Sequence, residues 1–511
     1  MTRRLTTLLL AAALATPALG DPPKKPLFGR HKTPISNVRA VPADAPPPAP
    51  PARAADVPVA TVDIQPALPS PPAAAATAEP APGAPVTVDQ IRAAYTFALP
   101  VYEMMRTRSL QVGKAESFGM PGVNRLYART TLADATTKDV TTPNNDTLYS
   151  SAWLDLAGGP VILDAPAIPN RYNSAALMDL FTNNVAVVGT RNGGKGGRYL
   201  IAGPAWHGEV PPQTTLIRSP TNDAWLLVRV LVDGPADLAA ATGLIRGFTL
   251  TDASDRRGAT VPITAVPVAD PKPAVFLAVV NEALGRNPMP SRATAFTDVG
   301  LLPLTPDNAA AAPSLAPDVA ALWAKSLPAL RAEIKGGLAA VGATVDGWSY
   351  TGTNIGSYGD SDDAARARVA LGGLGALPRT EAIYLTAATD AAGSPLTGTK
   401  AYTVHLPAHL PVGAFWSLTM YRQDTDGRLF FVETPSKRFA VGDRTPDLRA
   451  ERDGGYDIFV QPTAPSGERV VNWLPSPKGS FVLIFRAYLP GPAFLDGSFR
   501  LPPVQVTELI P

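Results

Sequence analysis

Two long stretches of this 511-residue chain consist of short apolar segments separated by proline, glycine and asparagine. Of all the features of the sequence, this pattern constrains the fold most. Such segments are typical of β-strands joined by turns. In the first stretch, residues 126–266, the expected strands cover 147–156, 175–188, 199–202 and 224–232. In the second, from 382 to the end, they cover 401–406, 414–421, 429–432, 456–461 and 480–488. We therefore expect a mainly β protein with two β-rich regions.

The strand expected over residues 224–232 is apolar on both of its alternating faces. Trp225 and Leu227 point to one side of the strand. Leu226, Val228 and Val230 point to the other side. A strand that is covered on both faces fits the core of a β-sandwich. The strand spacing after residue 382 fits a second sandwich of the jelly-roll kind.

Helical spacing of apolar residues appears before and between the two β-rich stretches. Residues 88–108 form one expected helix, with Thr87 as its N-cap and Gln90 three positions later. Further helices are expected over 274–284, 318–341 and 364–374. Because proline removes a helical hydrogen bond, we expect Pro100 and Pro328 to kink or break the helices that contain them. The expected domains are 87–266, with a helix and a sandwich, a helical insert at 267–380, and a C-terminal sandwich at 381–511.

The first 86 residues differ in composition from the remainder. Residues 1–20 have a positive start, a short apolar run and small residues before Asp21, which together indicate a cleavable signal peptide. Residues 21–86 contain 18 prolines and almost no aromatic residues, so we expect a disordered linker. The chain is thus expected to be exported to the periplasm or the extracellular space, with no stable membrane insertion after signal cleavage.

Charge and cysteine content exclude several classes of function. The formal net charge is only +2, and basic runs interleaved with aromatic residues are missing, so we expect no nucleic-acid partner. The chain contains no cysteine, which rules out disulfides, thiolate nucleophiles and cysteine-ligated metals. His405 and His409 are four residues apart, but Pro407 lies between them and the region is expected to be strand and turn. We therefore expect no metal and no other cofactor.

Several longer motifs resemble two families of proteins of unknown function. Residues 142–156 read TPNNDTLYSSAWLDL and residues 220–229 read PTNDAWLLVR, and both are similar to the family numbered 1254. Residues 414–421 read AFWSLTMY and residues 472–479 read NWLPSPKG, and both are similar to its companion, the family numbered 1214. The resemblance implies an immunoglobulin-like β-sandwich, a helical insert and a jelly-roll-like C-terminal β-sandwich. It implies no activity.

In the first β-rich region, a polar turn precedes an expected strand. Asn144, Asn145 and Asp146 form that turn, and Tyr149 follows on the strand. Their side chains either cap their own loop or line a polar pocket in which Asp146 acts as a general base or ligand acceptor. Arg229 lies within an apolar strand, and a buried guanidinium needs a partner. That partner is expected to be a structural carboxylate on Asp146, Asp155 or Asp179, or alternatively a bound anion.

In the second region, hydroxyl and aromatic side chains alternate with core residues. If two of the expected strands line a concave sheet, one set of side chains surrounds a pocket suited to a sugar or small polar acid: Ser417, Thr419, Tyr421, Arg486 and Tyr488. An exposed sheet face is the alternative. His405 is a further candidate general base.

These features lead to two hypotheses from different classes. The first is an exported envelope protein that binds a glycan or small polar molecule at the jelly-roll face or the domain junction. The alternative is a hydrolase or lyase that acts on such a compound, with Asp146, Arg229 or His405 as acid–base groups. The formation of a homo-oligomer is left open.

Overall fold

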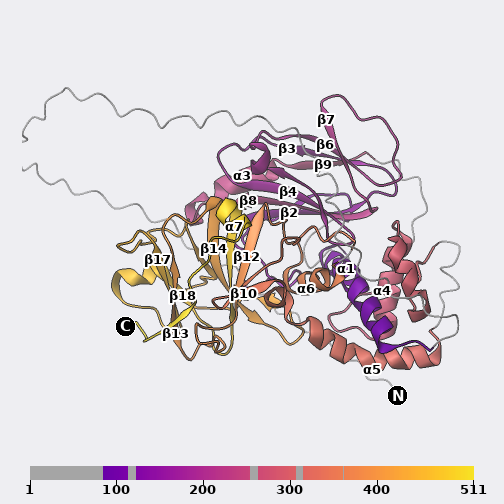
Figure 1. Ribbon diagram of the computed structural model, residues 1–511. Coiled ribbons are helices and arrows are strands. Elements are labelled where there is room, and N and C mark those ends of the chain that lie inside the picture. The colour runs from indigo at the N-terminus through magenta and orange to yellow at the C-terminus, as the bar shows by residue number, and fades with distance from the viewer. Residues whose placement is uncertain (1–84, 113–121, 254–262, 306–314, 361, 511) are drawn as a thin grey trace, which may run out of the picture. The chain divides into compact units, whose positions relative to one another are not determined.

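The computed structural model describes residues 85–112, 122–253, 263–305, 315–360 and 362–510. The expected signal peptide and nearly all of the expected linker lie outside these ranges. The described part of the chain is mainly β, as predicted, with helices before and between the β-rich regions (Figure 1). Within the described residues, no helix is long and apolar enough to span a bilayer.

The first β-rich region contains two sheets. The five-stranded sheet has, in spatial order, β1 (Tyr127–Ala128), β2 (Thr147–Asp155), β8 (Asp223–Leu231), β4 (Asn173–Asp179) and β5 (Asn184–Gly189). The four-stranded sheet has β7 (Thr214–Arg218), β6 (Gly197–Ala202), β3 (Val161–Ala165) and β9 (Thr249–Asp252). One strand was expected over residues 175–188. The structure divides it into β4 and β5, because Thr182 adopts a left-handed conformation with φ of 64° and the chain turns there.

Apolar side chains from both sheets fill the space between them. On β8, Leu226, Val228 and Val230 point into this core, where Leu163 and Ile201 of the opposite sheet meet them. Helix α3 (Leu238–Arg246) also contributes to this core. The alternate residues of β8 therefore point away from the partner sheet, toward the other side of the five-stranded sheet.

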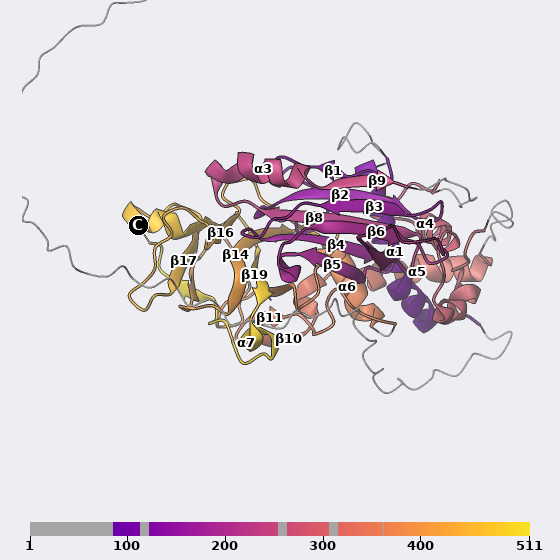
Figure 2. The same ribbon diagram turned by 90° about the horizontal axis from the view of Figure 1, so that it is seen from above.

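Helices cover part of that other side. They are α1 (Val88–Val112), α4 (Pro273–Gly285), α5 (Pro317–Ile334) and α6 (Asp363–Gly373). Trp153 and Trp225 stack with ring centroids 4.8 Å apart and join the helical core. Figure 2 shows α1 and α5 near one end of the five-stranded sheet.

Helix α1 begins as predicted but is longer than predicted. The Gln90 side chain accepts a hydrogen bond from the Thr87 amide at 2.8 Å, and the Thr87 hydroxyl accepts one from the Gln90 amide at 3.3 Å. Pro100 does not end the helix, and Pro328 does not end α5. A proline inside a helix costs about 3 kcal/mol, and buried side chains on both sides of each proline offset that cost.

The second β-rich region also contains two sheets. The seven-stranded sheet has β10 (Ala343–Val345), β11 (Trp348–Tyr350), β12 (Ala382–Ala387), β19 (Val482–Pro490), β14 (Val412–Gln423) and β15 (Leu429–Phe430), with β16 (Ala440–Gly442) also paired to β14. The four-stranded sheet has β18 (Trp473–Pro475), β17 (Tyr456–Gln461), β13 (Ala401–Leu406) and β20 (Gln505–Thr507). Strands β10 and β11 fall within the expected helical insert but extend this sheet.

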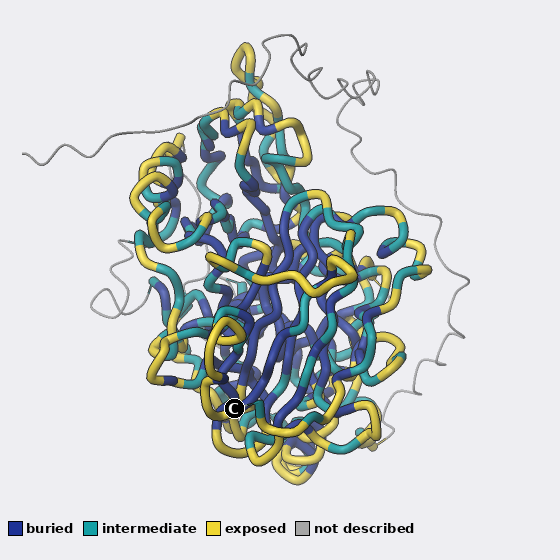
Figure 3. Tube along the Cα trace, turned by 90° about the vertical axis from the view of Figure 1, so that its left-hand side faces the viewer, coloured by how far each residue is buried: buried dark blue, intermediate teal, exposed yellow. Residues whose placement is uncertain are grey.

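The remaining helical elements are single turns or short segments. They are η1 (Thr190–Asn192), η2 (Pro235–Asp237), η3 (Ser291–Val299), η5 (Gly337–Ala340), η6 (Gly467–Asn472) and α7 (Pro492–Leu495). Figure 3 shows that buried residues fill the centre of the described part of the chain and that exposed residues lie mainly at its periphery.

The two faces of the seven-stranded sheet carry different side chains on β14, apolar on one face and hydroxyl-bearing on the other, as the alternation in the sequence predicts. Trp416, Leu418 and Met420 of β14 pack into the core against the four-stranded sheet. Ser417 and Thr419 point the opposite way and are nevertheless buried. They are buried because this outer face lies against the outer face of the five-stranded sheet, where the two β-rich regions meet.

Candidate functional site

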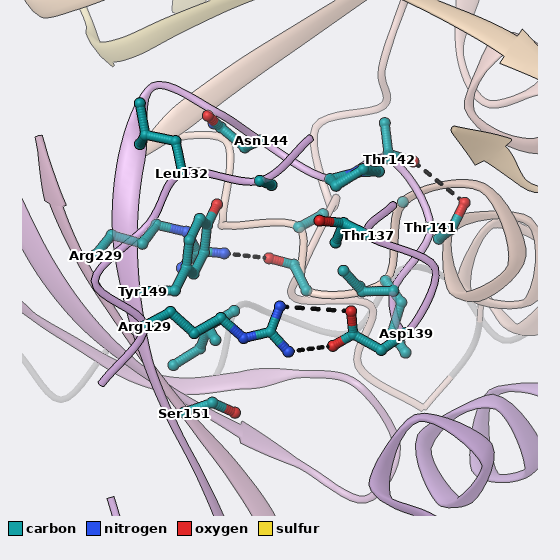
Figure 4. A pocket seen from close by; sticks show the side chains of 18 of the residues that line it. Arg129, Leu132, Thr137, Asp139, Thr141, Thr142, Asn144, Tyr149, Ser151 and Arg229 are labelled. Carbon is teal, nitrogen blue, oxygen red and sulfur yellow. Dashed lines mark hydrogen bonds and ion pairs between the residues drawn. The ribbon is translucent and has the colours of Figure 1, made fainter. Parts of the chain in front are cut away.

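A cavity of about 130 Å³ lies between the two outer sheet faces. The first region supplies part of its wall from β2, β8 and residues 129–144, and the second region supplies side chains from β12 and β19. The end of α1 and residues 373–376 complete the wall (Figure 4). The cavity therefore exists only where the two β-rich regions come together.

The wall from the first region follows the pairing of β2 with β8. Tyr149 lies directly opposite Arg229 in the antiparallel register, and Ser151 lies opposite Leu227. All four side chains line the cavity, together with Trp225. The same alternation that sends Leu226 and Val228 into the sandwich core thus directs this set toward the second region.

Arg229 is the least satisfied charged group in this wall. Its residue is only 4% exposed, and its Nη2 donates to the Gly375 carbonyl at 2.8 Å. Its guanidinium carbon lies 5.3 Å from the centre of the Tyr149 ring. The buried Nη1 has no hydrogen-bond partner among the described residues. A buried donor without a partner is costly, and the cost is larger when the group is charged.

The three carboxylates expected as partners of Arg229 are engaged elsewhere. Asp146 binds Arg444, with Nη2 to Oδ1 at 2.9 Å. Asp155 pairs with Arg286 at 3.1 Å. Asp179 accepts bonds from the amide and side chain of Asn183. The structural ion pair expected for Arg229 is therefore not formed with any of them.

The second region contributes Tyr384, Arg486 and Tyr488 to the cavity wall. Arg486 donates to the Thr419 hydroxyl at 3.0 Å and to the Tyr421 hydroxyl at 2.8 Å. Burial raises the pKa of both Tyr384 and Tyr488 above the ordinary tyrosine value. Both tyrosines are therefore protonated at neutral pH and present neutral hydroxyl groups.

The far end of the cavity holds a hydrogen-bonded network. The Gln111 amide donates to Asp139 at 2.8 Å, and Arg129 pairs with Asp139 at 2.6 Å. Gln111 also accepts from the Ser151 hydroxyl at 3.1 Å, and the Trp225 indole donates to that hydroxyl at 2.8 Å. The carboxylate at this end is therefore neutralised by an arginine, as the dashed lines in Figure 4 show.

Sequence reasoning missed several residues of this wall, including Gln111, Arg129, Asp139 and Tyr384. Gln111 stands in the last turn of α1, and Arg129 and Asp139 stand in an irregular segment. Periodicity carries no signal there. Tyr384 lies within β12, and the buried pattern of that strand does not distinguish it from core residues.

The predicted turn before β2 supports the cavity. Asn144 lines it and donates to the Tyr488 hydroxyl at 2.6 Å. Its side-chain oxygen accepts from the Asp146 amide at 2.6 Å, which is the expected capping of its own loop. Asp146 accepts from the Ser417 hydroxyl at 2.6 Å and lies behind the wall. Asn145 is half-buried and does not line the cavity.

The hydroxyl residues predicted around a sheet pocket stand behind the wall and brace it. Ser417 holds Asp146, and Thr419 holds Arg486. The Tyr421 hydroxyl donates to the Pro143 carbonyl at 2.6 Å. Ser417 and Tyr421 thus connect the two β-rich regions, and Thr419 holds Arg486 within the second region. Arg486 and Tyr488 of the same predicted set reach the cavity itself.

His405 lies elsewhere. It stands on β13 in the four-stranded sheet, with Nδ1 2.7 Å from an Asp457 oxygen and Nε2 3.3 Å from an Asp453 oxygen. It does not line the junction cavity. The described ranges contain no group of three or more histidine, aspartate or glutamate side chains placed to hold a metal ion.

Comparisons with known proteins give two family matches. Residues 123–252 match the family described as "Protein of unknown function (DUF1254)", and residues 381–492 match "Protein of unknown function (DUF1214)". No functionally curated protein matches the chain.

Two solved structures are similar to this chain. The VPA0106 protein from Vibrio parahaemolyticus has a TM-score of 0.59 and 24% identity, covering 82% of this chain and all of its own. An uncharacterised protein from Burkholderia cenocepacia has a TM-score of 0.42 and 12% identity, covering 83% of this chain and 91% of its own. The first similarity supports the fold alone.

Proposed function

The chain carries a DUF1254 region and a DUF1214 region in tandem, and from this premise we propose that it is an exported envelope protein that binds a glycan or small polar molecule at the junction of the two. The proposal includes a location in the periplasm or outside the cell. It also includes the finer architecture, an immunoglobulin-like sandwich followed by a jelly-roll-like sandwich. The two pairs of packed sheets are compatible with both descriptions.

One observation carries the binding proposal. Five residues selected from two separate parts of the sequence line a single cavity: Asn144, Tyr149, Arg229, Arg486 and Tyr488. Concave sites with an apolar lining and a few converging polar groups are the usual form of small-molecule sites. The amide, hydroxyl and guanidinium groups of these residues suit a ligand that offers hydrogen-bond acceptors.

A cavity-filling variant tests this proposal without knowledge of the ligand. Ala133 lines the cavity, so Ala133→Trp should occupy it. Thr136→Trp is the matched control, because Thr136 is exposed, lies in the same segment and does not line the cavity. Thermal unfolding is then measured against a panel of sugars and small organic acids.

We expect at least one panel compound to raise the unfolding temperature of the natural chain and of Thr136→Trp, but not that of Ala133→Trp. Stabilisation follows from binding to the folded state alone. Equal stabilisation of all three chains, or of none, would contradict a ligand site at the junction.

The hydrolase or lyase alternative finds less support in the geometry. It requires Asp146, Arg229 or His405 to act as acid–base groups. Asp146 is held by Ser417 and Arg444 behind the wall. His405 lies on β13, outside the cavity. Only Arg229 reaches the cavity, and arginine does not exchange its proton near neutral pH.

A further inference from the structure

The proposed function leaves the chemical class of the ligand open, and the cavity restricts it. Resting on that proposal, we infer that the ligand is a small organic monocarboxylate. Its carboxylate binds Arg229, and its compact apolar body lies against Trp225, Leu227 and Leu374. Charge, available donors and volume each support this assignment.

The unpaired donor of Arg229 indicates an anion. A buried guanidinium is expected to have a carboxylate or several carbonyl partners. Here Nη2 has one backbone carbonyl, on Gly375, and Nη1 has no partner among the residues described. Because Arg229 lines the cavity, a carboxylate there would lie beside this guanidinium and help to balance its charge. The planar, forked guanidinium matches a carboxylate in geometry.

Arg486 strengthens the preference for an anion. Its hydrogen bonds go to neutral oxygens, on Thr419, Tyr421 and the Thr142 backbone. It thus adds positive charge to the wall opposite Arg229. The Tyr488 hydroxyl accepts a bond from Asn144 and so retains its own proton to donate. Two cations and a hydroxyl donor therefore converge from opposite sheets.

The body of the ligand must be small and largely apolar. A dry protein cavity of about 150 Å³ holds one benzene ring, and the junction cavity has about 130 Å³. Its apolar lining includes Trp225, Leu227, Leu374 and Ala376. A disaccharide is larger than this volume and would not be enclosed by the cavity. Within the proposed range of ligands, the cavity therefore favours a small acid over a glycan.

The far end of the cavity argues against a second acidic group. Asp139 is only 1% exposed there and is neutralised by Arg129. A second ligand carboxylate at this end would lie near the carboxylate of Asp139. Because Arg129 is already paired with Asp139, this end offers, among the described residues, no unneutralised cation to a second carboxylate. The ligand is therefore a monocarboxylate rather than a dicarboxylate.

Calorimetric titration of the full chain tests this inference. The probes are sodium benzoate, sodium butyrate and sodium lactate, with benzamide as the uncharged counterpart of benzoate and glucose as a neutral sugar. We expect at least one carboxylate to bind, and benzamide to bind at least tenfold more weakly than benzoate. This comparison uses the natural chain and needs no variant.

Arg229→Gln adds a second test. It should weaken carboxylate binding at least tenfold, because it removes the cation and keeps an amide donor. Arg198→Gln is the matched control, since Arg198 is half-exposed on β6 and does not line the cavity. It should leave binding unchanged. Circular dichroism checks that both variants fold.

The results separate failure of the inference from failure of the proposed function. The inference is overturned if no carboxylate binds, if benzamide or glucose binds as tightly as benzoate, or if Arg229→Gln retains full affinity. In those cases the function proposal survives when Ala133→Trp still blocks stabilisation by a neutral compound. Both fail if Ala133→Trp and Thr136→Trp respond alike to every compound.

Discussion

The interior of the first sandwich and the junction between the two β-rich regions are lined by alternate residues of the same strands. On β8, Leu226 and Val228 pack in an apolar core, whereas Leu227 and Arg229 face the cavity. The interior is close-packed and uncharged, and the junction contains a cavity, two buried arginines and neutral oxygen partners. The comparison shows that one β-strand can stabilise the fold with one face and line a cavity with the other.

The largest difference in the free energy of unfolding should appear between alanine variants of two neighbouring leucines, Leu226 and Leu227. Leu226→Ala should lower the free energy of unfolding by about 2–5 kcal/mol, as is usual for a buried leucine in a packed core. Leu227→Ala should cost about 1 kcal/mol, because Leu227 is only partly buried and already borders a cavity. Urea unfolding of both variants measures this. Equal losses would remove the distinction between the two faces.

A smaller loss is expected when the junction contacts are broken. Asp146→Asn weakens the pairing with Arg444 and changes the bond from Ser417, and it should cost about 1–3 kcal/mol. Ser417→Ala should cost about 1 kcal/mol.

The losses of unfolding free energy caused by Asp146→Asn and Ser417→Ala should not be additive, since both variants alter the same hydrogen bond. A double-mutant cycle on urea unfolding measures the coupling between Asp146 and Ser417. Strict additivity would show that this bond does not stabilise the junction.

The smallest effect should be a change in pH dependence at Glu381. This residue is fully buried beside Tyr172, whose hydroxyl donates to it at 2.8 Å, and burial raises its pKa. The folded state therefore holds the Glu381 proton more tightly than the unfolded state. The resulting stability is present below the ordinary glutamate pKa and is lost as the pH rises through the folded value.

Glu381→Gln removes that titration. We expect the free energy of unfolding of the natural chain to fall, relative to Glu381→Gln, as the pH rises above about 4.5. Urea unfolding from pH 4 to 8 measures the difference. A relative rise over this range would show that Arg191, 3.3 Å away, dominates over burial.

Much of the fold follows from local pattern. The strand predicted over 224–232 differs from β8 by one residue at each end. The strand predicted over 401–406 has the same bounds as β13. The capping pair Thr87 and Gln90 located the start of α1. Local pattern did not predict that the helix continues through Pro100, because packing against distant parts of the chain stabilises it there.

The site was predicted only in part, because packing between distant segments of the chain decides which side chains line the cavity. Four residues of the cavity wall lie on strands: Tyr149, Arg229, Arg486 and Tyr488. Because successive side chains of a strand point to opposite faces, the sequence predicts which polar side chains point away from the core. Whether such a face is exposed or covered depends on how the two regions pack, and the alternation itself contains no signal for that. Ser417 was thus assigned to a pocket wall, although it braces the wall from behind.

The most direct test of the account is the electron density in the junction cavity of crystals grown with benzoate. We predict a planar feature in the cavity of the natural chain, with its carboxylate within hydrogen-bond distance of the Arg229 guanidinium and its ring against Trp225. An empty cavity at a benzoate concentration that saturates calorimetric binding, or a benzoate bound elsewhere, would contradict it.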